Sequence, residues 1–210
     1  MSQPAETPWI TAPGDELCLD FANTRFWRGT PEPREALHGF ADLLAWSRAR
    51  TGLPATEEAR AAIWAEDAPG AAAALFAEAL ALREAIYRLF HAVAEKQAAP
   101  EDLDRLNRAL ATMAERRAVV AEGAGFAWHV PAGAGAPSAV RLLTPVLWSA
   151  GDLLVGKRLA KVRHCANPEC AWLFIDDSKS GNRRWCSMSA CGNRAKAHRH
   201  YVRKKGRAID

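Results

Sequence analysis

The last quarter of the chain is decided by two stretches, Cys165-Ala166-Asn167-Pro168-Glu169-Cys170 and Cys186-Ser187-Met188-Ser189-Ala190-Cys191. Each stretch places four residues between two cysteines, and fifteen residues separate the two stretches. Zinc favours four soft ligands at the corners of a tetrahedron, and two tight turns can each supply two thiolates. The sequence therefore predicts one structural Zn²⁺ ion bound by Cys165, Cys170, Cys186 and Cys191.

Other uses of four cysteines fit the sequence less well. Two disulfides would need an oxidising compartment, but the first residues of the chain lack the basic segment and apolar run of a secretion signal. A redox-active pair normally has the spacing C-x-x-C, and both gaps here are wider. An iron–sulfur cluster also uses four thiolates, so the spacing alone leaves that alternative open.

Charge divides the chain into two parts. Residues 1–156 hold 14 Lys/Arg against 20 Asp/Glu, whereas residues 157–207 hold 14 Lys/Arg against three acids. This asymmetry indicates a polyanionic partner for the basic part, although the acidic and basic parts could also simply dock on each other. No apolar run approaches the length of a membrane span, so we expect no membrane partner.

The larger part, residues 1–156, is expected to be a helical domain, with a boundary near residue 157. Apolar residues at helical spacing, together with Gly and Pro punctuation, predict its helices. Helices are expected within residues 33–51, 56–64, 75–93, 100–113 and 138–154, with a kink at Pro145 in the last of them. A short β-hairpin is expected over residues 118–130, a loop over 131–137, and an extended arm over 1–13, anchored by Trp9 and Ile10.

A short apolar run near the front, from Glu16 to Thr24, could be a helix or a strand, because its periodicity does not decide. Cys18 lies far along the chain from the other cysteines, so we expect it to be a small core residue. Asp20 and Asn23 are polar residues late in the run, and their expected role is capping rather than catalysis.

The smaller part, residues 157–210, is expected to follow the treble-clef plan. Residues 171–176 and 182–185 predict a hairpin with a polar turn between them, preceded by a knuckle that carries the first cysteine pair. The second pair would lie at the hairpin exit, where Ser187 or Ser189 caps a helix. The fold class is therefore mainly α, with one short hairpin in the body and a small zinc finger after it.

The helix after Cys191 carries many cations. Its geometry places Ala195, His198 and Val202 on the face of Cys191, toward the metal, and a basic stripe opposite. No acid lies between Gly192 and Arg207, so an external anion would relieve the repulsion along the stripe; a solvated basic face is the plainer alternative. The candidate nucleic-acid-binding residues are Arg183, Arg184, Arg194, Lys196, Arg199, His200, Arg203, Lys204, Lys205 and Arg207.

Several finger residues have a second interpretation. The arginines Arg183, Arg184 and Arg194 could bind phosphate or guanine, or could instead tie the finger to carboxylates such as those of Asp176 and Asp177. Asn193 is expected to bond locally. With four thiolates present, His164 and His198 are expected to lie outside the metal shell.

Two stretches resemble known families. The run through Arg183-Arg184-Trp185-Cys186-Ser187-Met188 and Cys191-Gly192-Asn193-Arg194-Ala195-Lys196 resembles the CGNR zinc finger. The front run Leu17-Cys18-Leu19-Asp20-Phe21-Ala22-Asn23-Thr24 and the Ala-rich helical region after it resemble the ABATE domain, which precedes this finger in bacterial proteins. The resemblance implies a stress-linked bacterial transcription regulator.

We therefore expect a zinc-dependent protein that contacts nucleic acid, duplex DNA in the first place, while its body dimerises or senses a signal. RNA is an alternative partner if Trp172, Phe174 and Trp185 are exposed for stacking, although we expect them to be buried. A protein-interaction finger is a further alternative. An enzyme with a pocket in the body is disfavoured, because no hydrolase or phosphate-loop motif is present and four thiolates leave zinc no open position. Such a regulator would reside in the cytoplasm, at the nucleoid if it binds DNA.

Overall fold

A computed structural model describes residues 9–11, 13–113, 118–130 and 136–206 of the chain, and the side chains of 198–200 and 203–206 lie outside the description. The described part is mainly helical, as expected. Its helices are α1 (Leu17–Ala22), α2 (Phe40–Thr51), α3 (Ala55–Asp67), α4 (Pro69–Ala94), α5 (Pro100–Thr112), α6 (Ala139–Leu142), α7 (Thr144–Val155) and α8 (Asn193–Gly206). Its strands are β1 (Trp9–Thr11), β2 (Arg25–Phe26), β3 (Arg34–Glu35), β4 (Ala118–Glu122), β5 (Gly125–Val130), β6 (Val162–His164) and β7 (Leu173–Ile175).

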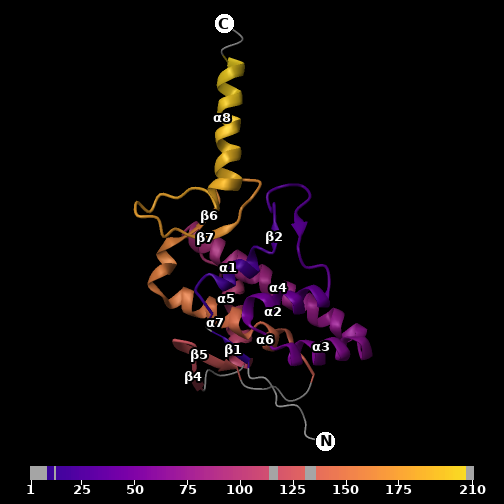
Figure 1. Cartoon of the computed structure of the whole chain (residues 1–210). Coiled ribbons are helices and arrows are strands. Elements are labelled where there is room, and N and C mark those ends of the chain that lie inside the picture. The colour runs from indigo at the N-terminus through magenta and orange to yellow at the C-terminus, as the bar shows by residue number, and fades with distance from the viewer. Residues whose placement is uncertain (1–8, 12, 114–117, 131–135, 207–210) are drawn as a thin grey trace, which may run out of the picture.

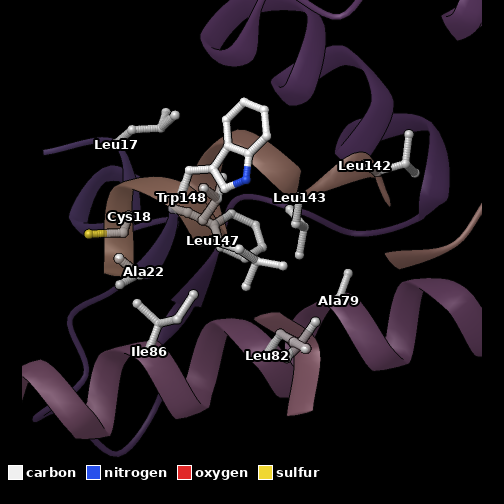
Figure 2. Close-up of a cluster of buried hydrophobic side chains, with 14 of the residues drawn as sticks. Leu17, Cys18, Ala22, Ala79, Leu82, Ile86, Leu142, Leu143, Leu147 and Trp148 are labelled. Carbon is white, nitrogen blue, oxygen red and sulfur yellow. The ribbon is translucent and has the colours of Figure 1, made fainter. Parts of the chain in front are cut away.

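The core of the body is built around α7 and the residue before it. Leu143, Leu147 and Trp148 are almost completely buried. Figure 2 shows them between residues of α1 and residues of α4. Residues labelled there from α1 and α4 are Leu17, Cys18, Ala22, Ala79, Leu82 and Ile86. Because α7 is apolar on nearly every side, it can only lie inside, and the other helices cover it.

Cys18 is a core residue, as the sequence suggested. Its side chain is fully buried, and its backbone N–H donates to Ser149 Oγ at 3.0 Å. Burial raises the pKa of the Cys18 thiol to about 12, so it stays protonated at neutral pH.

The helices predicted over 75–93 and 100–113 are confirmed as α4 and α5. The 26 residues of α4 bury one stripe that includes Leu75, Ala79 and Leu82, and Pro69 lies in its first turn, where a missing N–H costs nothing. Pro100 opens α5 in the same way.

Three predicted helix boundaries were wrong. The helix expected from residue 33 begins at Phe40, because the Glu35 carboxylate accepts the backbone N–H groups of Ala36 and Leu37 and holds that segment out of the helix. The helix expected from residue 56 begins after Pro54. The single kinked helix over 138–154 is two helices, with Ser138 capping α6 and Pro145 in the first turn of α7 rather than at a kink.

The expected hairpin forms from β4 and β5, and β1 extends it to a three-stranded antiparallel sheet. Trp9 anchors β1, because it is buried and its Nε1–H donates to the Thr51 carbonyl at 3.0 Å. The rest of the expected arm and most of the expected loop over 131–137 lie outside the described residues. The undecided run near the front is helix α1.

The finger sits at one end of the body. In Figure 1, β6 and β7 lie against the helical body, and α8 (yellow) projects away from it. Val162 of β6 and Leu173 and Ile175 of β7 belong to the same buried core as the body helices. The finger is therefore packed onto the body through its strands and leaves α8 standing clear.

Candidate metal centre

The sulfur atoms of Cys165, Cys170, Cys186 and Cys191 lie within 4.8 Å of one another. Cys170 Sγ is 3.7 Å from Cys186 Sγ, which is 3.8 Å from Cys191 Sγ. A tetrahedral zinc ion with Zn–S bonds of about 2.3 Å requires sulfur–sulfur edges of about 3.8 Å. The cysteines predicted from spacing therefore form a set with the size and donor chemistry of a structural zinc site.

The first cysteine pair lies on a knuckle that Asn167 organises. The Asn167 carbonyl accepts the backbone N–H groups of Cys170 and Ala171, at 2.9 and 3.2 Å, while its side-chain oxygen accepts that of Glu169 at 3.2 Å. Its Nδ2 lies 3.7 Å from Cys191 Sγ, so the amide donates toward a ligand from the second pair. Ala171 leaves the knuckle with φ +54°.

The knuckle lies within the hairpin, and not before it as we expected. Strand β6 ends at His164, β7 begins at Leu173, and the two strands pair antiparallel, so the hairpin brackets Cys165 and Cys170. Residues 182–185 form no strand. That segment is instead attached by the Ala166 N–H, which donates to the Arg184 carbonyl at 2.8 Å.

Of the second cysteine pair, Cys186 precedes and Cys191 lies within a π-helical turn, Met188–Gly192, that leads directly into α8. Of the two expected caps, Ser187 provides it, because its hydroxyl accepts the N–H of Ala190 at 3.1 Å. Asn193 bonds locally to the Ser189 carbonyl, as expected. Because Cys191 lies in the turn itself, a metal bound there fixes the first turn of α8 to the knuckle.

Contacts with neighbouring thiols shift the pKa values of Cys165, Cys170 and Cys186. Hydrogen bonds from the thiols of Cys170 and Cys186 lower the pKa of Cys165 to about 2. The hydrogen bond to Cys165 raises the pKa of Cys170, and that of Cys186 to about 12, because each of these thiols donates to the Cys165 sulfur, and burial adds to the rise. A divalent cation offsets the mutual repulsion of the thiolates, which allows all four to ionise and bind it.

The imidazole of His164 is engaged away from this set. His164 Nε2 pairs with the Glu95 carboxylate, and its ring lies 5.0 Å from that of His91. Among the described residues, the four cysteines form the only cluster that could hold a metal ion. The side chain of His198 lies outside the description.

The predicted arginines have different surroundings. Arg183 is engaged within the finger: Nε donates to the Trp185 carbonyl at 2.9 Å, Nη2 to that of Cys186, and the guanidinium lies over Phe174. Arg184 and Arg194 are exposed, and their guanidinium carbons lie over the rings of Trp185 and Trp27.

The carboxylates suggested as partners of these arginines bind other groups. Asp176 accepts the hydroxyl and N–H of Ser178 and the backbone N–H of Arg183, whereas Asp177 pairs with Arg158 and Lys161. The aromatic residues considered for RNA stacking are largely covered, since Phe174 is buried and Trp172 and Trp185 pack, half-buried, against the cysteines.

Along α8, Lys196 is exposed and so is Val202, at 53 %. The expectation that Val202 would face the metal was wrong, because its side chain is exposed on α8, a helix that projects away from the body (Figure 1). The side chains of Arg199, His200, Arg203, Lys204 and Lys205, and the whole of Arg207, lie outside the described residues.

Body residues complete the centre through contacts that the sequence did not predict. Trp27 packs against the cysteine cluster, and the Gly29 N–H donates to the Glu169 carbonyl at 3.2 Å. The Tyr87 hydroxyl donates to the Ala171 carbonyl at 3.0 Å. Asn23 lies at the C-cap of α1, as expected, and its side chain also bonds both main-chain groups of Leu173. These contacts join positions far apart in sequence, so no local pattern could have indicated them.

Comparisons with known proteins agree with this architecture. No helix in the described part of the chain combines the length and apolar character needed to cross a bilayer. A search of curated proteins found no match. Residues 161–204 match the CGNR zinc finger, and residues 15–157 match the ABATE model, described as "Putative stress-induced transcription regulator". Neither description names an enzymatic activity, and the match over most of its length shows that the chain belongs to the ABATE family, with a CGNR zinc finger after the family domain.

Proposed function

We propose that this protein is a transcription regulator that binds duplex DNA through its zinc-supported basic helix. The observation that carries the proposal is α8, a 14-residue helix that projects from the molecule and starts in the turn holding Cys191. A helix of this length is about 21 Å long, and its diameter of about 10 to 12 Å fits the DNA major groove, which is about 12 Å wide.

Charge favours a polyanion as the partner of α8. The helix contains six Lys/Arg residues and no acid. Like charges at neighbouring positions on a helix destabilise it by some tenths of a kcal/mol per pair, and phosphate groups would remove that penalty. The exposed Tyr201 and Val202 supply apolar contact surface of the kind that thymine methyl groups accept.

Salt-dependent binding tests the proposal. The zinc-loaded full chain would be titrated with labelled duplex DNA by fluorescence anisotropy between 50 and 300 mM KCl. We expect the logarithm of the binding constant to fall linearly with that of the salt concentration, by about 0.9 per phosphate contacted. The variant Arg203→Gln/Lys204→Gln/Lys205→Gln should reduce this slope by about 2 to 3.

Arg105→Gln, which removes one exposed charge on α5, is the control and should leave the slope unchanged. An affinity that stays flat with salt, or tighter binding to single-stranded RNA than to duplex DNA, would contradict the proposal. DNA binding would also place the protein in the cytoplasm at the nucleoid, and we expect the body to dimerise so that two α8 helices reach one duplex.

A further inference from the structure

A groove of about 670 Å³ lies beside the metal centre, between the knuckle and the first turns of α8. Its walls include Asn167, Glu169, Arg184, Trp185 and Arg194. A second hollow, of about 510 Å³, shares Glu169 and Arg194 with it and is lined on the other side by body residues between Trp27 and Arg34. Arg194 therefore stands between two adjoining hollows, one of the finger and one at the body–finger junction.

The two arginines of the groove keep their hydrogen-bonding capacity free. Arg184 lies 5.3 Å from the ring centroid of Trp185, and Arg194 lies 4.4 Å from that of Trp27. Among the described residues, neither guanidinium has a hydrogen-bond or carboxylate partner, whereas that of Arg183 is bonded to two carbonyls. A guanidinium over an aromatic ring retains its in-plane N–H donors, which match the oxygens of a phosphate.

The tryptophans themselves offer little surface to a stacking ligand. Trp27 and Trp185 both pack against the cysteine cluster, and each has an arginine over its ring. A nucleobase or another flat apolar ligand would have to displace the arginine. The free chemistry of the groove is therefore that of N–H donors and positive charge, with Glu169 as its one acid.

We propose that this groove binds the phosphate backbone of the DNA strand, with one phosphate at each arginine, as a second contact region beside α8. The inference rests on the proposed function and extends it, because Arg194 lies over Trp27 of the body. The nucleic-acid interface thus includes a body residue, and any shift of the segment that carries Trp27 would alter the position of Arg194.

Single substitutions in the full, zinc-loaded chain test the groove by the same anisotropy titration. We expect Arg184→Gln and Arg194→Gln each to lower the salt slope by about 0.9 and to weaken binding about three- to tenfold near 0.1 M salt. Glu169→Gln should strengthen binding about two- to threefold, because it removes the one charge that repels a phosphate there. Arg194→Lys should keep the slope and weaken binding only slightly, and Arg105→Gln should match the wild type.

Zinc content and far-UV circular dichroism of each variant establish that the fold is retained, and the gain expected for Glu169→Gln does not depend on the arginine variants folding. The wild type could bind DNA with the expected salt dependence while all three variants, Arg184→Gln, Arg194→Gln and Glu169→Gln, keep the wild-type affinity and slope. That result would overturn the proposed phosphate contact in the groove and leave the proposed function standing.

Failure of the wild type to bind DNA would instead remove the proposed function. The groove is then tested by titrating inorganic phosphate and thymidine monophosphate against the arginine Nε–Hε signals in NMR spectra. If both ligands shift the Arg184 and Arg194 signals, the groove binds phosphate groups of free ligands. If the signals stay unshifted, the groove is not a phosphate site.

Discussion

At the scale of single residues, the Asn23 side chain makes the main-chain hydrogen bonds that a neighbouring strand would otherwise make with β7. Its Nδ2–H donates to the Leu173 carbonyl at 2.8 Å and its Oδ1 accepts the Leu173 N–H at 3.0 Å. Both main-chain groups of a buried residue in β7 are thereby satisfied by one amide at the end of α1. A buried main-chain group without a partner is costly, so Asn23 is a principal link between body and finger.

Replacing Asn23 by alanine should lower the free energy of unfolding by about 2 to 4 kcal/mol, because an N–H and a C=O lose their partners in a buried junction. Urea unfolding of the zinc-loaded chain, followed by tryptophan fluorescence, measures the change. Asn182→Ala, in an exposed turn, is the matched control and should change stability by less than about 0.5 kcal/mol. Equal stabilities of the two variants would show that the Asn23 amide does not hold the finger.

The metal ligands and Asn23 show which residue roles the sequence could predict. Cys165 and its three partners were assigned because ligand spacing within each turn is local and zinc accepts few donor sets. Asn23 occupies the C-cap position of α1, as expected, but the bonds of its side chain to Leu173 could not be predicted because that residue lies 150 residues further along the chain. Arg183 was left between two roles, since the carbonyls that it binds have no signature in the sequence.

At the scale of elements, the finger hairpin was placed on the wrong strands. Residues 171–176 and 182–185 both contain aromatic residues and appeared to match each other, whereas the true partner of β7 is the short β6. A three-residue strand with two polar positions carries almost no periodic signal. In contrast, α4 and α5 could be predicted because each repeats its apolar stripe over several turns. Pro100 also indicated the start of α5, whereas α4 begins at Pro69, before the stripe at Leu75 from which it was expected.

The segment between β2 and β3 touches the knuckle at Gly29. A Cβ atom at this position would lie 1.8 Å from the Pro168 carbonyl oxygen. Gly29→Ala should therefore push the knuckle away from the body, lower the free energy of unfolding by about 1 to 3 kcal/mol and speed the release of zinc to a chelator. Stopped-flow detection with a coloured zinc chelator measures the release.

Gly39→Ala is the control for this change, because a Cβ there would meet nothing within 4 Å. If both variants released zinc at the wild-type rate, the close approach of Gly29 to the knuckle would have no influence on the metal centre.

An ion-pair network holds β3 against α4. Arg83, almost completely buried, donates to both Glu35 oxygens at 2.6 and 2.7 Å, and Arg28 donates to Glu84 at 2.7 Å. Burial raises the pKa of each carboxyl, but the hydrogen bonds and charges of these arginines outweigh it and hold both pKa values below normal. A carboxylate with a lowered folded-state pKa stabilises the fold above its unfolded pKa, and that stability is lost as the pH falls through the folded value.

The unfolding free energy of the wild type should therefore exceed that of Glu35→Gln at pH 7 by about 1 to 3 kcal/mol, and this difference should shrink as the pH falls below about 4.5. Comparing the two proteins at each pH cancels proton competition for the zinc thiolates, which affects both equally. Urea titrations at pH 7, 5 and 3.5 supply the values, and a difference that stayed constant over this range would refute the role of Glu35.

At the scale of the whole molecule, the two ends of the finger differ in their contacts with the body. The suggestion that acidic and basic parts dock on each other holds at Arg158, which pairs with Asp15 and Glu16 of the body at 3.2 Å. It does not hold for α8, which points away from the body (Figure 1). The strands of the finger are thus packed on the body, whereas its helix α8 extends away from the body. The metal centre connects the strands to the helix.

The zinc-edge X-ray absorption spectrum of the purified full chain, together with its metal content, tests the metal centre most directly. We expect one zinc per chain with four sulfur neighbours at about 2.3 Å, and three sulfurs with one lighter atom in Cys170→Ser. A chain that retains no zinc, that carries an iron–sulfur cluster instead, or whose zinc has nitrogen or oxygen among its neighbours in the wild type would contradict the four-thiolate centre.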